Sequence, residues 1–225
     1  MVTKQQLQQW NKHKWEIKNH AMYETHAQNK WPWFCAKLDP DIDDFLVRCA
    51  LNALDVLDLG TCSGSQGIEL ARRGHRVVGT DISETALAQA IQAAGQEPGL
   101  PIRFLIDDIT ESQLAPAQFD LVLDRGCYHS ICSFQHDEYI AGVKRVLKRD
   151  GVVLLKTMSS DEQRFVSYDE IGGRKVQMPY HFRREELLGR LAPHFTILQL
   201  RDSFFYSEVV DPPAKARFAI LRNDR

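Results

Sequence analysis

The sequence predicts a doubly wound α/β domain, in which helices cover both faces of a mostly parallel sheet. Short apolar runs that suit buried strands alternate with amphipathic segments between residues 41 and 157. A glycine-punctuated turn follows the first of these strands, and two β-rich runs close the chain. Strands that alternate with helices in this way are typical of parallel sheets.

The composition limits the possible partners. With 225 residues, the chain is long enough for one α/β domain with a full core. Its 28 Lys and Arg against 30 Asp and Glu leave a net charge of −2, so no overall field favours nucleic acid or an anionic membrane. No apolar run approaches the roughly 20 residues that span a bilayer. We therefore expect a small-molecule partner, with no nucleic acid and no membrane.

The cysteines and the N-terminus indicate the compartment. The five cysteines are odd in number and lack the spacing of metal ligands, so we expect no metal site. No apolar signal region opens the chain. These features favour a reducing cytoplasm as the location of the protein. Separately, we expect a monomer or a weak dimer.

The first 40 residues differ from the rest of the chain. Residues 1 to about 29 are polar with scattered apolar side chains, which predicts one or two amphipathic helices outside the sheet. Residues 30–34 gather Trp31, Trp33 and Phe34 around Pro32. This aromatic segment either docks the arm on the core or forms part of a lid. We expect residues 1–40 to form a helical arm, with the lid as one of these two alternatives, and residues 41–225 to form a single domain.

The elements of this domain follow from the apolar pattern. Ile42, Phe45 and Leu46 predict a helix over 41–54 that leads into a strand over 56–59. The polar segment 159–180 interrupts the alternation with a small hairpin around Gly172 and Gly173, and we interpret it as a substrate cover. The other predicted elements are helix 66–73, strand 75–80, helix 83–94, strands 102–106 and 119–124, helix 136–147, strand 151–157, helix 185–191 and the β-rich runs 195–205 and 217–221.

The turn after the first strand has the features of a cofactor cradle. Gly60 and Gly64 allow a tight turn in which bare backbone N–H groups face a ligand at a helix N-terminus. Asp58, two residues before Gly60, would repel a pyrophosphate but attract a cation. Asp81 ends the second strand about 20 residues later, where dinucleotide and related sites hold a ribose.

The pattern Asp58-x-Gly60-x-x-x-Gly64, followed by Asp81, resembles the cofactor site of the class I S-adenosylmethionine-dependent methyltransferases. The resemblance implies S-adenosylmethionine as the cofactor and a Rossmann-like, seven-stranded, mostly parallel sheet with an antiparallel C-terminal strand. It also implies that Asp81 holds the ribose diol. Cys62 stands where the family pattern has a further glycine. The remaining cofactor contacts that the resemblance implies are Thr61, Cys62, Ile82, Asp108, Ile109 and Asp124.

Residues 124–130 lie at the carboxyl end of the fourth strand, where open α/β sheets place their chemistry. Asp124-Arg125-Gly126 resembles the corresponding region of the small-molecule branch of the family, which acts on thiopurines, thiols and halides. This implies catalytic roles for Asp124, Arg125 and His129, with Arg125 stabilising a thiolate or His129 serving as a base for a hydroxyl. The contacts to the acceptor would come from Trp33, Tyr128 and His129. The alternative is a structural Asp124–Arg125 pair and a histidine bound to backbone.

The sequence therefore predicts a methyltransferase that uses S-adenosylmethionine and a small nucleophile, a thiol or another soft acceptor. O- or N-methylation of a small metabolite is an alternative. A nucleotide-dependent oxidoreductase would share the glycine turn and Asp81 but would not explain Asp58. A cofactor-binding protein without catalysis is a further alternative, suggested by Cys62. The neutral charge and the lack of a basic aromatic patch disfavour a macromolecular acceptor.

Overall fold

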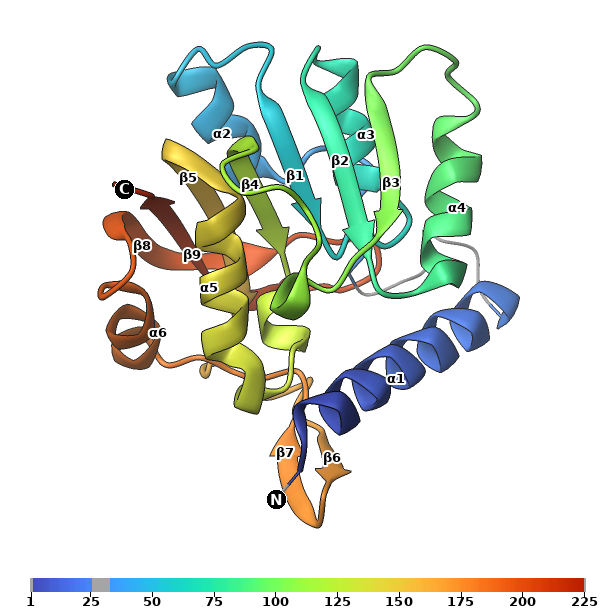
Figure 1. The fold of residues 1–225 in the computed structure, drawn as a ribbon, viewed down its shortest axis with the longest axis vertical. Helices are drawn as coiled ribbons and strands as arrows, with labels where there is room; N and C mark the ends of the chain where they lie inside the picture. The colour runs from blue at the N-terminus through green and yellow to red at the C-terminus, as the bar shows by residue number, and fades with distance from the viewer. Residues whose placement is uncertain (1, 26–32, 225) are drawn as a thin grey trace.

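The computed structural model describes residues 2–25 and 33–224 and has a seven-stranded sheet at its centre (Figure 1). The strand order is β3-β2-β1-β4-β5-β9-β8, and β9 runs antiparallel to both of its neighbours while the other adjacent pairs are parallel. The strands are β1 Asp55–Leu59, β2 Arg76–Asp81, β3 Ile102–Ile106, β4 Phe119–Arg125, β5 Leu147–Met158, β8 Thr196–Phe205 and β9 Ala214–Arg222. This confirms the predicted Rossmann-like sheet with an antiparallel C-terminal strand.

Helices cover both faces of the sheet because successive side chains of a strand point to opposite sides. Leu57 of β1 packs in the core cluster that contains α5 and α6, whereas its neighbour Val56 packs with α2 and α3. α2 is shorter than predicted, since Ala50 and Ala53 have φ angles of 48° and 54°, which end the helix. The helices are α2 Pro40–Arg48, α3 Ser65–Arg72, α4 Glu84–Ala94, α5 His136–Val146 and α6 Arg184–Leu191.

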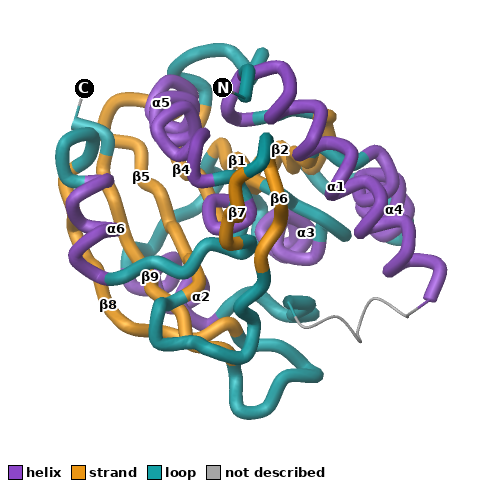
Figure 2. The backbone as a smooth tube through the Cα atoms, turned by 90° about the horizontal axis from the view of Figure 1, so that it is seen from below, coloured by secondary structure: helices purple, strands orange, loops and turns teal. Residues whose placement is uncertain are grey.

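The first helix, α1 (Lys4–Thr25), is continuous and runs past the carboxyl ends of the parallel strands (Figures 1 and 2). Beside its start lies a hairpin of β6 (Tyr168–Ile171) and β7 (Arg174–Gln177), which confirms the hairpin predicted within 159–180. Leu7 of α1 packs against residues of this hairpin, and Lys14 forms a salt bridge with Asp169. The helix and the hairpin therefore form one cover over this edge of the sheet.

Residues 30–32 of the predicted aromatic segment lie outside the described residues, which resume at Trp33. Within the described part of the chain, none of the helices combines the length and the apolar character needed to cross a membrane.

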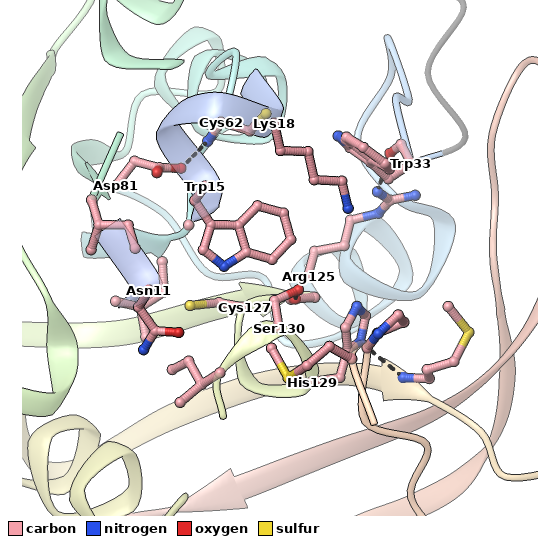
Figure 3. Close-up of a pocket in the computed structure, with 18 of the residues that line it drawn as sticks. Asn11, Trp15, Lys18, Trp33, Cys62, Asp81, Arg125, Cys127, His129 and Ser130 are labelled. Atoms are coloured by element: carbon pink, nitrogen blue, oxygen red, sulfur yellow. Dashed lines mark hydrogen bonds between the residues drawn. The ribbon is translucent and has the colours of Figure 1, made fainter. Parts of the chain in front are cut away.

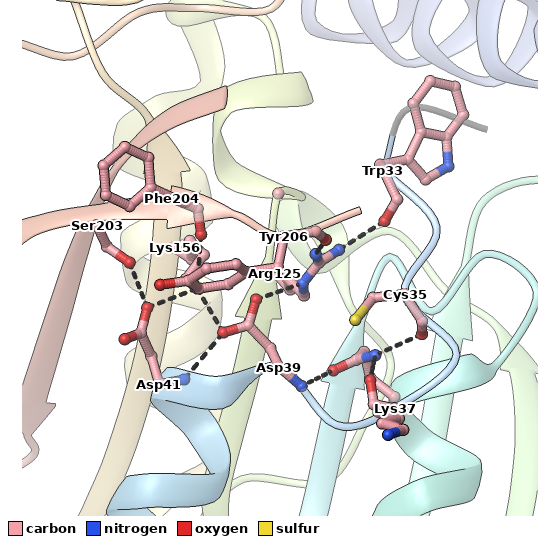
Figure 4. Close-up of polar contacts among 12 residues, drawn as sticks. Trp33, Cys35, Lys37, Asp39, Asp41, Arg125, Lys156, Ser203, Phe204 and Tyr206 are labelled. Atoms are coloured by element: carbon pink, nitrogen blue, oxygen red, sulfur yellow. Dashed lines mark hydrogen bonds and ion pairs between the residues drawn. The ribbon is translucent and has the colours of Figure 1, made fainter. Parts of the chain in front are cut away.

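A buried network of charges joins the start of α2 to the sheet (Figure 4). Asp39 is the N-cap of α2 and accepts hydrogen bonds from Lys156 of β5 and from Arg125 of β4, the latter at 2.8 Å. Lys156 also contacts Asp41 at 2.6 Å. Burial would raise the pKa of the Asp41 carboxyl, but the charge of Lys156 and several hydrogen bonds outweigh this effect and lower it. The network fixes the segment after Trp33 against the ends of β4 and β5.

We predict that Lys156→Met destabilises the protein by about 3–5 kcal/mol, because it leaves two buried carboxylates without their shared cation. Lys148→Met is the matched control: this lysine lies on the same strand and also contacts two aspartates, Asp55 and Asp120, but at the surface. Its loss should cost less than about 1 kcal/mol. Urea denaturation of the two variants measures the difference. Equal losses would contradict a buried network that depends on Lys156.

Candidate functional site

The turn between β1 and α3 takes the shape that its glycines predict. Gly60 and Gly64 have φ angles of 62° and 79°, and Cys62 has a φ of 51°, which is uncommon for a residue with a side chain. The Cys62 N–H donates a 3.0 Å hydrogen bond to the Asp81 carboxylate. The cysteine therefore occupies a backbone conformation that suits glycine, and the turn keeps its shape at the cost of some local strain.

The two strand-tip acids have different surroundings. Asp81 accepts hydrogen bonds from the N–H groups of Cys62 and Ser83, both at 3.0 Å, and burial raises its pKa to about 6. Asp58 accepts a 2.6 Å bond from the Thr61 hydroxyl and a bond from the Gly67 N–H, and burial raises its pKa to about 7. Asp58 thus stabilises the glycine turn through its hydrogen bonds and lines only a smaller hollow, whereas Asp81 lines the main cavity.

At the end of β3, the consecutive residues Asp107 and Asp108 have different hydrogen-bond partners. Asp108 caps the short turn η2 (Ile109–Glu111) by accepting bonds from the N–H and the hydroxyl of Thr110, at 2.9 and 2.7 Å. Asp107 binds Gln113 N–H through one oxygen, while its other oxygen is buried without a partner among the described residues. Asp107 is therefore a site candidate that the sequence analysis missed, because the sequence does not reveal which acid caps the turn.

Asp124 does not line the cavity, contrary to the catalytic and cofactor roles expected for it. Its carboxylate is fully buried and accepts hydrogen bonds from the N–H groups of Gly126, Cys127 and Tyr128, at 2.9, 2.7 and 2.9 Å, and from the Tyr139 hydroxyl. Burial raises its pKa to about 6 although these bonds oppose the shift. Asp124 is a positioning residue that folds the loop after β4.

Arg125 lines the cavity, but its guanidinium is committed elsewhere. It donates to the Asp39 carboxylate at 2.8 Å and to the carbonyl oxygens of Trp33, at 2.7 Å, and Tyr206 (Figure 4). Asp39 therefore balances the charge of Arg125. This differs from the expectation that Arg125 stabilises a thiolate. The expected structural pair of Asp124 and Arg125 does not form either, since each has other partners.

Tyr128 is a core residue and not a contact to the acceptor. It belongs to the turn η3 (Tyr128–Ser130), which directs its ring into the core between Tyr139 and Phe182, with ring centroids 4.4 and 4.9 Å away. Its hydroxyl is buried without a hydrogen-bond partner in the described chain. The next residue, His129, points the other way and lines the cavity.

The imidazole of His129 has a defined tautomer. Its Nδ1 accepts a 3.0 Å hydrogen bond from the Met158 N–H, so the proton of the neutral ring is on Nε2. Burial lowers the pKa of the ring to about 3, and the nearby charges of Lys18 and Arg125 act in the same direction. His129 is thus a neutral hydrogen-bond donor at the cavity wall, as the alternative of a backbone-bound histidine predicts.

These residues surround a cavity of about 490 Å³ between the sheet edge and α1 (Figure 3). A smaller hollow of about 50 Å³ adjoins it at Asp58 and shares Trp33, Gly60 and Cys62 with it. Of the predicted site residues, the main cavity contains Trp33, Gly60, Cys62, Asp81, Ile82, Asp108, Ile109, Arg125 and His129. It does not contain Asp58, Thr61, Gly64, Asp124 or Tyr128.

Side chains of α1 complete the cavity, and none of them was among the site residues predicted from the sequence. Asn11, Trp15 and Lys18 recur about every fourth residue and therefore lie on one side of the helix, toward the cavity (Figure 3). This spacing was the one feature of the sequence that could have indicated that the three residues share a side of the helix. A polar helix with few and scattered apolar side chains has no clear apolar period, so the sequence did not reveal which side faces inward.

Comparisons with known proteins identify the family. Residues 56–151 match a family described as a methyltransferase domain. An uncharacterized methyltransferase of Schizosaccharomyces pombe is 34% identical over 105 residues, which cover 47% of this chain and 72% of that protein. The protein-lysine N-methyltransferase EFM4 of Saccharomyces cerevisiae is 29% identical over 164 residues, 64% of this chain and 71% of that protein.

Among solved structures, the 1,6-didemethyltoxoflavin-N1-methyltransferase of Burkholderia thailandensis has the same fold. The two structures superpose with a TM-score of 0.70 at 20% identity, covering 95% of this chain and 87% of the other. That structure contains 1,6-didemethyltoxoflavin and S-adenosylhomocysteine.

The stacked tyrosines behind the cavity give a matched test of the loop after β4. Tyr139→Phe removes a hydrogen bond to the buried Asp124 carboxylate, and we expect it to cost about 1.5–3 kcal/mol of unfolding free energy. Tyr128→Phe removes a buried hydroxyl that has no partner, so stability should stay the same or rise slightly. Chemical denaturation compares the two. A larger loss for Tyr128→Phe would mean that its hydroxyl has a role in the folded protein.

Proposed function

The chain belongs to the class I S-adenosylmethionine-dependent methyltransferases, and on this basis we propose that it methylates a small, soft nucleophile, a thiolate in the first place. The observation that carries the proposal is the state of His129, the titratable base expected at the acceptor side. Its Nδ1 lone pair is already used by the Met158 N–H, and Nε2 bears the proton. Such a ring donates a hydrogen bond but does not accept a proton from a substrate hydroxyl.

The residues around the cavity fit the cofactor. S-adenosylmethionine supplies an electrophilic methyl group on a sulfonium. We propose that Asp81 accepts hydrogen bonds from the ribose diol, and that the unpartnered oxygen of Asp107 meets the adenine amino group beside Asp108. Ile82 and Ile109 offer apolar contacts to the flat ring. Backbone N–H groups of the turn after β1 would face the amino-acid end, near the small hollow at Asp58.

A thiolate does not need a base at the moment of transfer. It forms the new sulfur–carbon bond with its own lone pair, and no proton has to move. The protein then contributes mainly position, and holding two reactants in line is worth on the order of 7–11 kcal/mol. Apolar walls from Met158, Phe165 and Phe205 exclude water from a soft nucleophile, which is weakly hydrated compared with an oxyanion.

The cover over the cavity favours a small acceptor over a protein. α1 and the β6–β7 hairpin are joined by the Lys14–Asp169 salt bridge and lie across the side from which a protein side chain would enter. The similarity to a protein-lysine N-methyltransferase makes a lysine acceptor the main competitor. Lysine methylation requires a deprotonated amine, and His129, whose Nδ1 accepts the Met158 N–H and whose Nε2 bears the proton, does not take a proton from a lysine ammonium.

We predict that thiols are methylated faster than phenols, amines or a lysine peptide in a turnover screen that measures release of S-adenosylhomocysteine. The rate with a thiol should rise as the thiol ionises near pH 8.5, with no inflection at an imidazole pKa near 6.5. His129→Asn keeps an oxygen that can accept from the Met158 N–H, and it should retain at least about a tenth of the rate. A loss of about 100-fold or more in this variant, together with phenol turnover, would show that His129 acts as a base.

Cofactor affinity should depend on the ionisation of Asp81. Its raised pKa, about 6 in the free protein, means that the carboxylate becomes protonated as the pH falls below 6 and then accepts fewer hydrogen bonds. We expect S-adenosylhomocysteine binding, measured by calorimetry, to weaken between pH 7 and pH 5. Asp81→Asn should bind more weakly at pH 7 and lose most of this dependence, while Asp120→Asn, far from the cavity, should keep it. A full pH dependence in Asp81→Asn would exclude this role.

A further inference from the structure

Lys18 is the cation of the cavity whose charge is least compensated. It projects from α1 into the cavity, with its ammonium 4.6 Å from the ring centroid of Trp15 and 5.2 Å from that of Trp33 (Figure 3). Among the residues that the structure describes, no carboxylate forms a salt bridge with it. Burial is the main cause of the lowered pKa of Lys18, and the charge of Lys14 adds to it.

The other cationic side chains of the cavity each have a carboxylate partner. Lys14 pairs with Asp169, Arg125 with Asp39 at 2.8 Å, and Arg164 with Glu162 at 2.7 Å. These three ion pairs stabilise the cover, the network at α2 and the segment after β5, respectively. Two aromatic faces stabilise the Lys18 ammonium only in part, because a cation–π contact is weaker than a buried ion pair.

The charges of the cavity are also separated in space. The carboxylates that line it, Asp81, Asp107 and Asp108, lie at the tips of β2 and β3, where the cofactor would bind. The opposite part is lined by Lys18 and by the neutral donor His129, which the charge of Lys18 reaches. The acceptor half therefore offers one ammonium and one ring N–H. Asp169 is the carboxylate whose charge reaches Lys18, and it forms its salt bridge with Lys14.

We propose that the methyl acceptor is an organic anion with an apolar body, in which a negative charge apart from the reacting sulfur lies against the Lys18 ammonium. This inference rests on the proposed function and narrows its substrate class. Met158, Phe165 and Phe205 supply apolar contacts for the body of such a molecule. The charge on the acceptor would replace the carboxylate partner that Lys18 lacks, in a site where burial strengthens the attraction.

Binding of two matched ligands tests the proposal without turnover. The full chain, saturated with S-adenosylhomocysteine, is titrated by calorimetry with benzoate and with its neutral isostere benzamide. We expect the wild type to bind benzoate about tenfold tighter or more, as a charge-assisted contact provides. Lys18→Met should reduce this ratio to less than about threefold, and Lys18→Arg should preserve most of it.

Lys12→Met is the matched control, because it removes the same charge from the same helix at a position outside the cavity. It should leave the ratio of the two affinities unchanged. Equal affinities of the wild type for benzoate and benzamide, or no detectable binding of either, would overturn the proposal, as would a ratio that survives Lys18→Met. If thiols are methylated but benzoate and benzamide bind equally, the anionic acceptor is contradicted and the proposed function stands. If benzoate binds more tightly but thiols are not methylated, the proposed function is contradicted and the anion site at Lys18 stands.

Discussion

The carboxylates of Asp39 and Asp41 hold together the parts of the chain that surround the cavity. Lys156, with 1% of its side chain exposed, contacts both of them, and Arg125 reaches Asp39 from the end of β4. Buried charges without partners cost several kcal/mol, so these groups are satisfied only when α2, β4 and β5 are all in place. The same guanidinium binds the carbonyl oxygens of Trp33 and Tyr206, which fixes the cavity wall. The shape of the site thus depends on a network that lies largely outside it.

A second group of acids acts on the backbone of the site and not on its ligands. Asp124 collects three N–H groups and the Tyr139 hydroxyl, and Asp58 holds Thr61 and Gly67 across the glycine turn. Each of these carboxylates accepts bonds that a neutral side chain would not match, which gives the two loops one conformation. The loops then direct His129 and Cys62 toward the cavity. Charged residues of the predicted cofactor motif therefore serve two purposes: Asp58 and Asp124 stabilise loops, whereas Asp81 lines the cavity.

The cavity that results has an acidic half and a half lined by donors. Asp81 and Asp107 lie where a nucleoside would bind, while Lys18 and the Nε2–H of His129 lie on the other side. With a thiolate as the acceptor, the donor sulfonium and the acceptor sulfur would lose opposite charges when the methyl group moves. A site that excludes water favours such a transfer because the two charges neutralise each other in the transition state, and no proton relay is required. The physical features of both halves thus agree with one type of reaction.

The sequence by itself determined the alternating strands and helices, the glycine turn and the position of the strand-tip acid Asp81, because apolar periodicity and glycine positions are local properties of the chain. The antiparallel last strand followed from the resemblance to a known family. The sequence also placed the hairpin within 159–180. Only the tertiary structure decided which polar side chains face the cavity. Asp124, Arg125 and Tyr128 became a loop brace, a buried ion-pair member and a core residue, while Asp107 and Lys18 came to line the site. Hydrogen-bond partners far apart in the chain set these orientations, and no local pattern records them.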